Sequence, residues 1–238
     1  MIVVSGSAQA AAVKAKCKPA PRAKCAGADL RKAKLNGIDL TGANLAGANL
    51  TGVNMNGATL VRATLTGAKM AGAKLVGADL TAAKLGGANL ARADLALARM
   101  TGANFSRADM TAANLSNGDL SGADFTSAKM AGATLMFSAA TGVNLNGADL
   151  TNAKLFAAVM AKANLTGANL TGGDLTGVSL AGAKLLSTNF TRASLFNTDL
   201  SGANITGATF DGVSWFAVVC PDGSVTFPTG SKASCEVV

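Results

Sequence analysis

Large apolar residues recur at every fifth position along most of the chain, from Leu30 to Trp215. Of these 38 positions, only Ala140 lacks a large apolar side chain. The position two residues earlier is alanine in 28 of the 38 units, and the residue between the two is usually Asp, Asn, Lys, Thr or Ser. The repeating unit is therefore alanine, polar residue, leucine, small residue and glycine, and it keeps one frame throughout.

The period of five excludes an α-helix and predicts short extended segments joined by turns. Residues of an α-helix advance by about 100° each, so successive leucines would step about 140° around the axis and share no face. In an extended segment, residues two apart lie on one face, so the alanine and the leucine can both point inward. An odd period would turn every second leucine outward unless the chain bends once per unit. Glycine adopts positive φ without steric cost and is suited to that bend.

Units such as GADL and GANL, in unbroken tandem, resemble those of the pentapeptide-repeat family, whose consensus is A(D/N)LXX. The resemblance covers residues 26–215. It implies an all-β fold, a right-handed quadrilateral β-helix or solenoid, in which one unit forms each side and four units form a coil. On that geometry the array makes about 9.5 four-sided coils and a rod roughly 45 Å long. Residues 1–25 are then expected to be a leader and N-terminal cap, and residues 216–238 a C-terminal capping tail.

All four cysteines lie outside the repeats. Cys17 and Cys25 precede the array, and Cys220 and Cys235 follow it. The resemblance places the two ends of the rod tens of ångströms apart, whereas bridged Cα atoms lie within about 7 Å. The expected disulfides are therefore Cys17 with Cys25 and Cys220 with Cys235, and four free buried thiols are the alternative. Neither spacing is typical of zinc ligands and the chain has no histidine, so no metal site is expected.

Paired cysteines indicate an oxidising compartment, and the N-terminus agrees in part. MIVVSGSAQA ends in the small-x-small pattern of a signal-peptidase site, but it has no charged start and its apolar segment is short. Residues 1–10 are therefore either the tail of a signal peptide, with cleavage after Ala10, or a disordered leader. We predict an exported protein in the periplasm or another extracytoplasmic compartment, and a cytoplasmic protein is the alternative.

The net charge of +8 limits the choice of partner. Some pentapeptide-repeat proteins protect DNA gyrase by resembling duplex DNA, which requires an acidic face. Here the array holds 15 Lys and Arg against 11 Asp. The best acidic column runs from Asp39 to Asp199 at intervals of twenty, and Arg99, Ala139 and Val159 interrupt it. A cytoplasmic gyrase regulator of the DNA-mimic type is therefore the disfavoured alternative function.

The basic residues themselves give only weak evidence for nucleic-acid binding. In the array they alternate with aspartates and have no aromatic platform beside them, so they indicate a solvated face of mixed charge. A denser basic stretch precedes the array, and it is either a loose leader or a contact with anionic membrane headgroups or cell-wall anions. Its members are Lys14, Lys16, Lys18, Arg22 and Lys24.

Two units break the outward polar pattern, MFSAA at 136–140 and FAAVM at 156–160. Because they lie twenty residues apart, the family geometry stacks them on one face in adjacent coils, with Leu97 and Phe196 two coils away on either side. Such apolar patches often mark interfaces, so a protein partner or self-association through one face is expected. A local distortion around Ala140, in which an outward side chain folds inward, is the alternative. The candidate interface residues are Met136, Phe137, Ala139, Phe156, Ala157 and Val159.

The sequence offers no catalytic constellation. Histidine and tyrosine are absent, and no GK[ST] follows a glycine-rich loop. The aspartates recur as periodic surface residues, and serine and threonine have no histidine partner. We therefore predict no cofactor, no small-molecule substrate and no enzymatic activity. The predicted function is a structural or protein-interaction scaffold that presents a rigid solenoid surface to a protein.

Overall fold

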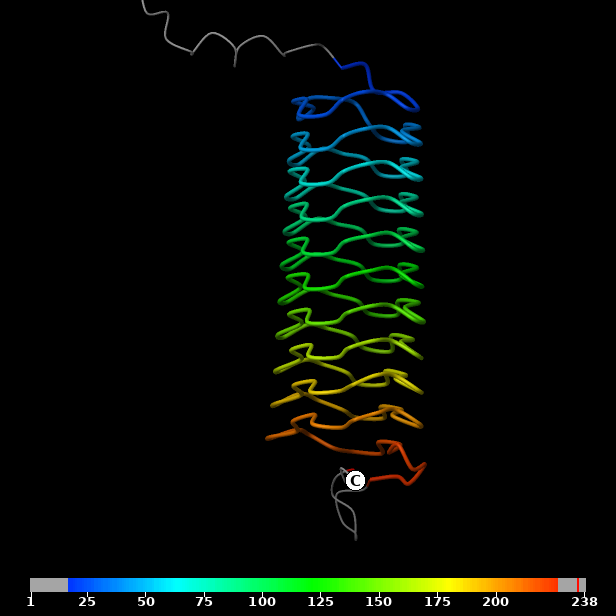
Figure 1. Ribbon diagram of the computed structural model, residues 1–238, viewed down its shortest axis with the longest axis vertical. Helices are drawn as coiled ribbons and strands as arrows, with labels where there is room; N and C mark the ends of the chain where they lie inside the picture. The colour runs from blue at the N-terminus through cyan, green and yellow to red at the C-terminus, as the bar shows by residue number, and fades with distance from the viewer. Residues whose placement is uncertain (1–16, 227–234, 236–238) are drawn as a thin grey trace, which may run out of the picture.

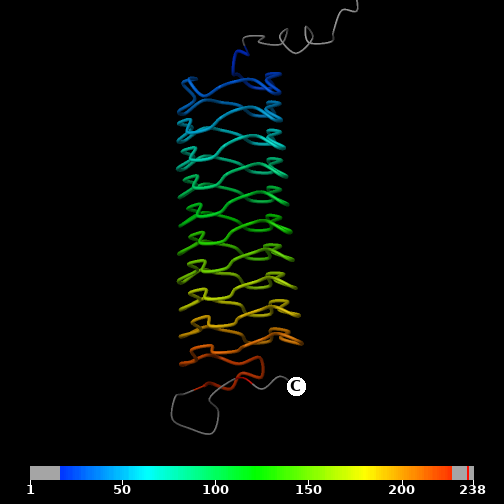
Figure 2. The same cartoon turned by 90° about the vertical axis from the view of Figure 1, so that its left-hand side faces the viewer.

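The computed structural model describes residues 17–226 and residue 235, so the predicted leader at 1–10 lies outside the described part. Figure 1 shows the chain wound into coils that stack along one long axis, with the N-terminal coils at one end and the C-terminal coils at the other. Figure 2, turned by 90°, shows the same stacking with little lateral drift. The molecule is therefore a nearly straight rod.

Each five-residue unit consists of one extended residue and one turn. After Leu50, residues Thr51 and Gly52 form the turn, and the amide of Val53 donates to the carbonyl of Leu50 at 3.1 Å. Gly52 has a φ of 65°, and a type II β-turn requires positive φ at that position. Across residues 17–226 and 235, strands are reduced to single bridging residues and no helix is present. The same described part contains no helix of the length and apolarity that crossing a bilayer requires.

Parallel bridges between residues twenty apart join each coil to the next. We call each column of residues bridged at intervals of twenty a ladder. The first bridge along the chain joins Lys24 and Asn44, and the register is kept up to the bridge between Asp199 and Val219. At each level the residue at the leucine position donates its amide to the next coil, as Leu50 does to the carbonyl of Lys69 at 2.7 Å. Four units therefore complete one coil, and the fold is a four-sided β-helix.

The alanine and the leucine of each unit point inward, which confirms the prediction from the period. Ala43 and Leu45 are fully buried, and their counterparts in the following units stay buried as far as Ile205. The inward residues of the last two units of the array, Ala208, Phe210, Val213 and Trp215, are half-buried. Interior rings stack one coil apart, so Phe105 lies on Phe125 with centroids 4.8 Å apart and planes within 1°. Each buried leucine contributes about 1.5–3 kcal/mol, but no coil can cover its own upper and lower faces. Stability is therefore collective along the column.

The coil geometry continues past both ends of the predicted array. Cys25 is buried and donates its amide to the carbonyl of Asn44 at 2.7 Å. At the other end Val218 and Cys220 are buried, after which Val225 pairs antiparallel with Val219. Cys25 and Cys220 both occupy the leucine phase of the period, so each lies at an end of the internal column.

Both cysteine pairs close within their own end of the rod. The Cα atoms of Cys17 and Cys25 lie 5.3 Å apart, and those of Cys220 and Cys235 lie 5.4 Å apart, which is within the range of bridged cysteines. The described residues include no free cysteine. The bridges therefore lie where a solenoid would otherwise expose its unpaired end coils.

Candidate interaction surface

The polar residues on the regular faces cap the turns that follow them. The side-chain oxygen of Asn49 accepts a hydrogen bond from the amide of Thr51 at 3.2 Å and from its hydroxyl at 2.8 Å. Asp39 accepts from the amide of Thr41 in the same way at 2.8 Å. Our sequence reasoning assigned these residues to solvent contact alone. The missed signal was the recurrence of Asp or Asn two residues before Thr or Ser, which is typical of Asx-turns.

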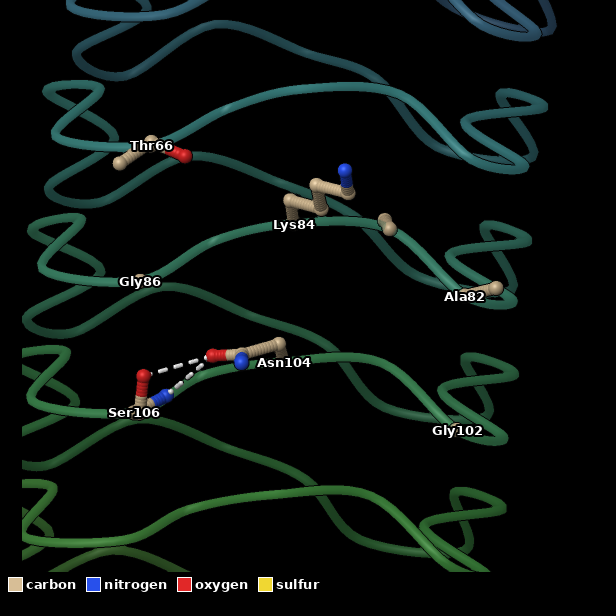
Figure 3. A pocket seen from close by; sticks show the side chains of 8 residues that line it. Thr66, Ala82, Lys84, Gly86, Gly102, Asn104 and Ser106 are labelled. Atoms are coloured by element: carbon tan, nitrogen blue, oxygen red, sulfur yellow. Dashed lines mark hydrogen bonds between the residues drawn. The ribbon is translucent and has the colours of Figure 1, made fainter.

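Figure 3 shows one hollow on a face of the rod. It has a volume of about 350 Å³ and arises because Gly86 has no side chain between Thr66 and Ser106, one coil away on either side. Asn104 accepts from the amide and the hydroxyl of Ser106 at 2.9 and 2.7 Å, so these polar groups already bind one another. Among the described residues no group of three or more His, Cys, Asp or Glu side chains is placed to hold a metal ion. The hollow therefore lacks the groups of a catalytic or metal site.

One corner of the rod carries most of the exposed large apolar side chains. Seven such side chains are exposed in the described residues, and six of them lie on this corner or on the ladder beside it. The six are Leu97, Phe137, Phe156, Val159, Phe196 and Phe216. We call this corner the apolar edge, and it consists of the turn residues 76–77, 96–97, 116–117, 136–137, 156–157, 176–177, 196–197 and 216–217.

Pairs of aromatic rings pack against each other on the outside of the apolar edge. Phe137 is 54% exposed and Phe156 is 36% exposed, and their rings meet edge to face with centroids 5.4 Å apart. Phe196 and Phe216 form a second such pair at 6.2 Å. Edge-to-face packing is a favoured aromatic geometry, so each pair forms a ridge in place of two separate rings.

The backbone under these rings is regular, so the distortion alternative is wrong. Phe137 donates its amide to the carbonyl of Phe156 at 2.9 Å, and Ala140 donates to Val159 at 2.7 Å, as in every other coil. Ala140 itself is fully buried, and no outward ring has folded into the space of the missing leucine. The outward direction of Phe137 and Phe156 is therefore a property of the regular fold.

The structure brings all six predicted interface residues together in two adjacent coils. Residues 136–137 and 156–157 are neighbouring turns of the apolar edge, and Ala139 bridges directly to Val159 on the ladder beside it. Sequence reasoning missed Phe216, which it assigned to the C-terminal tail. The signal was present, because Phe216 follows Phe196 by one full coil of twenty residues.

Two of the exposed apolar residues hold a strained backbone conformation. Leu97 has a φ of 60° and Phe137 a φ of 58°, at a turn position that glycine occupies in most units. They are the large apolar residues among the described non-glycine residues with positive φ. The left-handed conformation costs an L-residue roughly 1–2 kcal/mol. Fifteen other described non-glycine residues share this turn conformation, so the strain is a property of the turn and does not by itself mark a functional site.

The ladder beside the apolar edge changes from charged to apolar along its length. Its central members are Asp79, Arg99, Asp119, Ala139 and Val159, each bridged to the next. Partial burial raises the pKa of Asp119, but hydrogen bonds from Ser121 and Thr101 and the charge of Arg99 lower it more, so the pKa lies below its usual value. The amide of Ser121 and the hydroxyl of Thr101 donate to this carboxylate at 3.0 and 2.9 Å. Asp119 is therefore ionised at neutral pH.

The basic N-terminal stretch is only partly described. Lys18, Arg22 and Lys24 are exposed at the N-terminal end of the rod, whereas Lys14 and Lys16 lie outside the described residues. Their contact with an anionic surface stays a prediction. They lie at one end of the rod, so they do not belong to the apolar edge, which begins further along the chain at residue 76.

A family model described as pentapeptide repeats matches residues 23–60, 43–81, 73–111, 103–136, 135–172 and 174–212, with 8 copies. Among solved structures, HetL is 33% identical; it is a pentapeptide repeat protein involved in heterocyst differentiation regulation from the cyanobacterium Nostoc sp. strain PCC 7120. The match covers 81% of this chain and 94% of HetL with a TM-score of 0.31.

Two further solved structures are similar. A pentapeptide repeat protein from the thylakoid lumen of Arabidopsis thaliana is 34% identical over 40% of this chain and 66% of its own, with a TM-score of 0.39. QnrB1, a plasmid-mediated fluoroquinolone resistance protein, is 23% identical over 64% of this chain and 70% of its own, with a TM-score of 0.40. The comparison with curated proteins gives no match.

Proposed function

Because the chain belongs to the pentapeptide-repeat family, whose fold is a right-handed quadrilateral β-helix, we propose that it is a non-enzymatic scaffold. It binds a protein through the apolar edge. The observation that carries the proposal is the position of its aromatic rings. Phe105, Phe125 and Phe190 are buried in the column, whereas the four exposed phenylalanines among the described residues all lie on one corner. Aromatic residues are enriched at the centres of protein interfaces, where they contribute most of the binding energy.

The β-helix holds this surface rigid. The turns of the apolar edge are fixed by ladder bonds above and below, such as those from Phe137 to Phe156 and from Gly177 to Phe196. Binding through a preformed surface avoids the entropy that ordering a loop would cost. A partner therefore meets a straight row of apolar side chains at the spacing of the coils.

We also propose that both disulfides form in the native protein and that it works in an extracytoplasmic, oxidising compartment. Support comes from the two pairs of cysteines, each confined to one end of the rod. Disulfides persist in secreted and periplasmic proteins and are rare in the cytosol. A native disulfide typically contributes about 2–5 kcal/mol, which suits the end coils because they have a neighbour on one side only.

A cytoplasmic DNA mimic is the weaker candidate. It would need a continuous acidic surface, yet the ladder that starts at Asp39 contains Arg99 and then the apolar pair Ala139 and Val159. The whole chain has a net charge of +8. A surface that attracts a DNA-binding enzyme in place of DNA carries the opposite sign.

The role of the apolar edge is tested by capture of partner proteins from a lysate of the source cells. The double variant Phe137→Ser, Phe156→Ser should lose at least about tenfold of the captured protein, since interface aromatics contribute about 2 kcal/mol each. The matched control is Arg107→Ser, Lys162→Ser, because both residues hold the same turn position on other corners, with φ of 57° and 59°. Equal capture by the two double variants would refute the proposal.

The compartment is tested by thiol titration together with cell fractionation. The protein purified from its source cells without reductant should show no reactive thiol when denatured, and four after reduction, because the chain has four cysteines. It should also be found in the extracytoplasmic fraction. Four reactive thiols before reduction, or a cytoplasmic location, would contradict the proposed compartment and leave the role of the apolar edge to its own test.

A further inference from the structure

The apolar edge lies between two ladders whose charges are complementary. One ladder leads into the corner and contains Lys74 and Asp94, and the other leaves it and contains Asp79 and Arg99. Members of the two ladders that differ by five residues lie at nearly the same height on either side of the corner, because a coil takes twenty residues. At two heights of the apolar edge these members have opposite charges, and at none do they have the same charge. The two pairs are Lys74 with Asp79 and Asp94 with Arg99.

None of these four residues forms an ion pair within the described chain, because the corner separates the two ladders. Asp79 and Asp94 accept hydrogen bonds from the amides of Thr81 and Ala96 in the turns that follow them. A second rod placed against the corner would bring the two ladders of one copy close to the two ladders of the other copy. Whether like or opposite charges then meet depends on the relative direction of the two rods.

We propose that the partner of the apolar edge is a second copy of this chain, bound in parallel about a two-fold axis that runs along the length of the rods. The proposal rests on the apolar edge being an interaction surface, as proposed above, and it names the occupant. A two-fold axis makes every contact occur twice, with residue i on j and j on i. With the axis parallel to the rods, each residue meets residues of its own height on the second copy.

The parallel arrangement places each turn of the edge against the same turn of the second copy, so that Phe216 lies opposite its Ala217 and Phe196 lies opposite its Asn197. The turns 136–137 and 156–157 each contact the same turn of the second copy, and so do the polar turns 116–117 and 176–177. The two-fold axis places the first residue of each turn opposite the second residue of the same turn in the other copy. In the turns 136–137 and 156–157 a large side chain therefore faces a smaller one. Phe156 lies opposite Ala157 of the second copy, and Phe137 lies opposite its Met136. Rings and small residues can therefore interlock along the edge.

The same axis places the ladder that contains Lys74 and Asp94 opposite the ladder that contains Asp79 and Arg99. Lys74 then faces Asp79 of the second copy, and Asp94 faces its Arg99. An antiparallel dimer would instead place each ladder opposite itself. If centred between Phe137 and Phe156, it would place Leu97 against Asn197 and Phe216 against Val76, and its one pair of opposite charges would be Arg99 with Asp199. Each pair occurs twice in a dimer, so the parallel direction has four contacts between opposite charges and the antiparallel direction has two. The charge pattern therefore favours the parallel direction.

The size of the edge indicates a weak dimer. From residue 77 to residue 217 the edge spans seven coils, which at about 4.8 Å each makes about 34 Å. A strip of that length and about 12 Å wide buries about 800 Å² in total over both copies, which is less than the roughly 1,200 Å² of stable specific interfaces and within the range of weak, transient ones. We therefore expect a dimer that dissociates in the micromolar range, about 1–100 µM.

Sedimentation equilibrium of the purified full chain, over about 1–300 µM, measures this association directly. We expect a monomer–dimer equilibrium, and at least a tenfold larger Kd for Phe137→Ser, Phe156→Ser. Arg99→Asp should weaken association about three- to tenfold because each dimer gains two repulsive contacts, and the added change Asp94→Arg should restore it. A strictly monomeric wild-type chain at about 300 µM would overturn the proposal. If that monomer still captured another protein through the edge, the proposed function would stand and only the self-pairing would fail.

Cysteine crosslinking decides the direction of the two rods. Ser116 and Thr176 lie on the apolar edge three coils apart, about 14 Å, so their cysteine variants cannot bridge within one chain. In the parallel dimer Ser116→Cys alone and Thr176→Cys alone should each give a covalent dimer on mild oxidation. Crosslinking that requires both substitutions in one chain would establish an antiparallel dimer and refute the proposal.

Ser121→Cys is the matched control for this crosslinking. Ser121 is the same residue type as Ser116 at the same turn position of the next corner, and both are half-buried. It should give no covalent dimer above background. Equal yields from Ser116→Cys and Ser121→Cys would mean random collision and would also refute the proposal. Circular dichroism of each variant, compared with that of the wild type, verifies that the coil is folded.

Discussion

Ser138 is the interior residue whose chemistry fits its place least well. It occupies the inward alanine position, is 1% exposed, and its hydroxyl oxygen has no hydrogen-bond partner. Thr188 occupies the same position two and a half coils later, but its hydroxyl donates to the carbonyl of Leu165 at 2.8 Å. The column therefore tolerates a hydroxyl where the carbonyl of a neighbouring coil can accept its hydrogen bond.

This difference predicts opposite effects of the same substitution. Ser138→Ala should raise the free energy of unfolding by about 1–2 kcal/mol, because it removes a buried group without a partner. Thr188→Ala should lower it by about 1–2 kcal/mol, because it removes a satisfied hydrogen bond and a buried methyl group. Chemical denaturation measures both. A loss of stability in both variants would show that Ser138 has a partner that the structure does not reveal.

At the residue scale, the sequence predicted the direction of side chains better than their bonds. The period of five placed Ala43 and Leu45 inside, since only that arrangement buries every leucine. It did not predict that Asn49 accepts from Thr51, because an outward polar residue satisfies the same pattern whether or not it caps a turn. It left open whether Phe137 stays outside or folds inward beside the small Ala140, because that depends on the ladder bonds of the neighbouring coils.

The turn is the element that repeats most strictly. Its second residue has positive φ whether it is glycine, as at Gly87 with 65°, or another residue, as at Ala82 with 55°. The bonds to the coils above and below impose this conformation, so residue identity changes the cost of the turn and not its shape. The sequence predicted glycine at the corner, but it could not show that Arg, Ser, Ala and Phe would adopt the same φ there.

Exchanging glycine and alanine at two corners measures that cost. Ala82→Gly should raise the free energy of unfolding by about 1 kcal/mol, and Gly87→Ala should lower it by about the same amount, because an L-residue is strained at positive φ. A Cβ added at Gly87 would meet no atom within 4 Å, so the loss would come from the backbone alone. Thermal and chemical denaturation report both changes. Equal stability of Gly87→Ala and the wild type would contradict the strain at the turn.

At the scale of the whole molecule, the repeat determines the rod and the deviations from the repeat determine its faces. The family resemblance and the period together predicted the stacking of residues twenty apart, which the bridge from Lys24 to Asn44 onward shows directly. The apolar edge was predicted around Phe137 and Phe156, with Leu97 and Phe196 on the same face. Its extension to Phe216 was missed because that residue follows the last regular unit and was assigned to the tail, although it lies twenty residues after Phe196.

The charges beside the apolar edge show why a partner is harder to predict than a fold. Lys74 and Asp79 are ordinary polar members of consecutive units, and only the four-sided geometry places them on two faces of one corner. Their use depends on a second molecule that the sequence of one chain does not describe. A fold follows from contacts within the chain, whereas an interface needs the surface of its partner as well.

Site-specific photo-crosslinking in the source cells tests the central claim, that the apolar edge is the surface through which this scaffold acts. The photoreactive analogue p-benzoylphenylalanine replaces Phe137 in one strain, and Arg107 or Lys162, which hold the same turn position on other corners, in control strains. We predict a discrete crosslinked product from position 137, at twice the mass of the chain for the proposed dimer, and none from the controls. No product from position 137, or the same products from all three positions, would contradict the account.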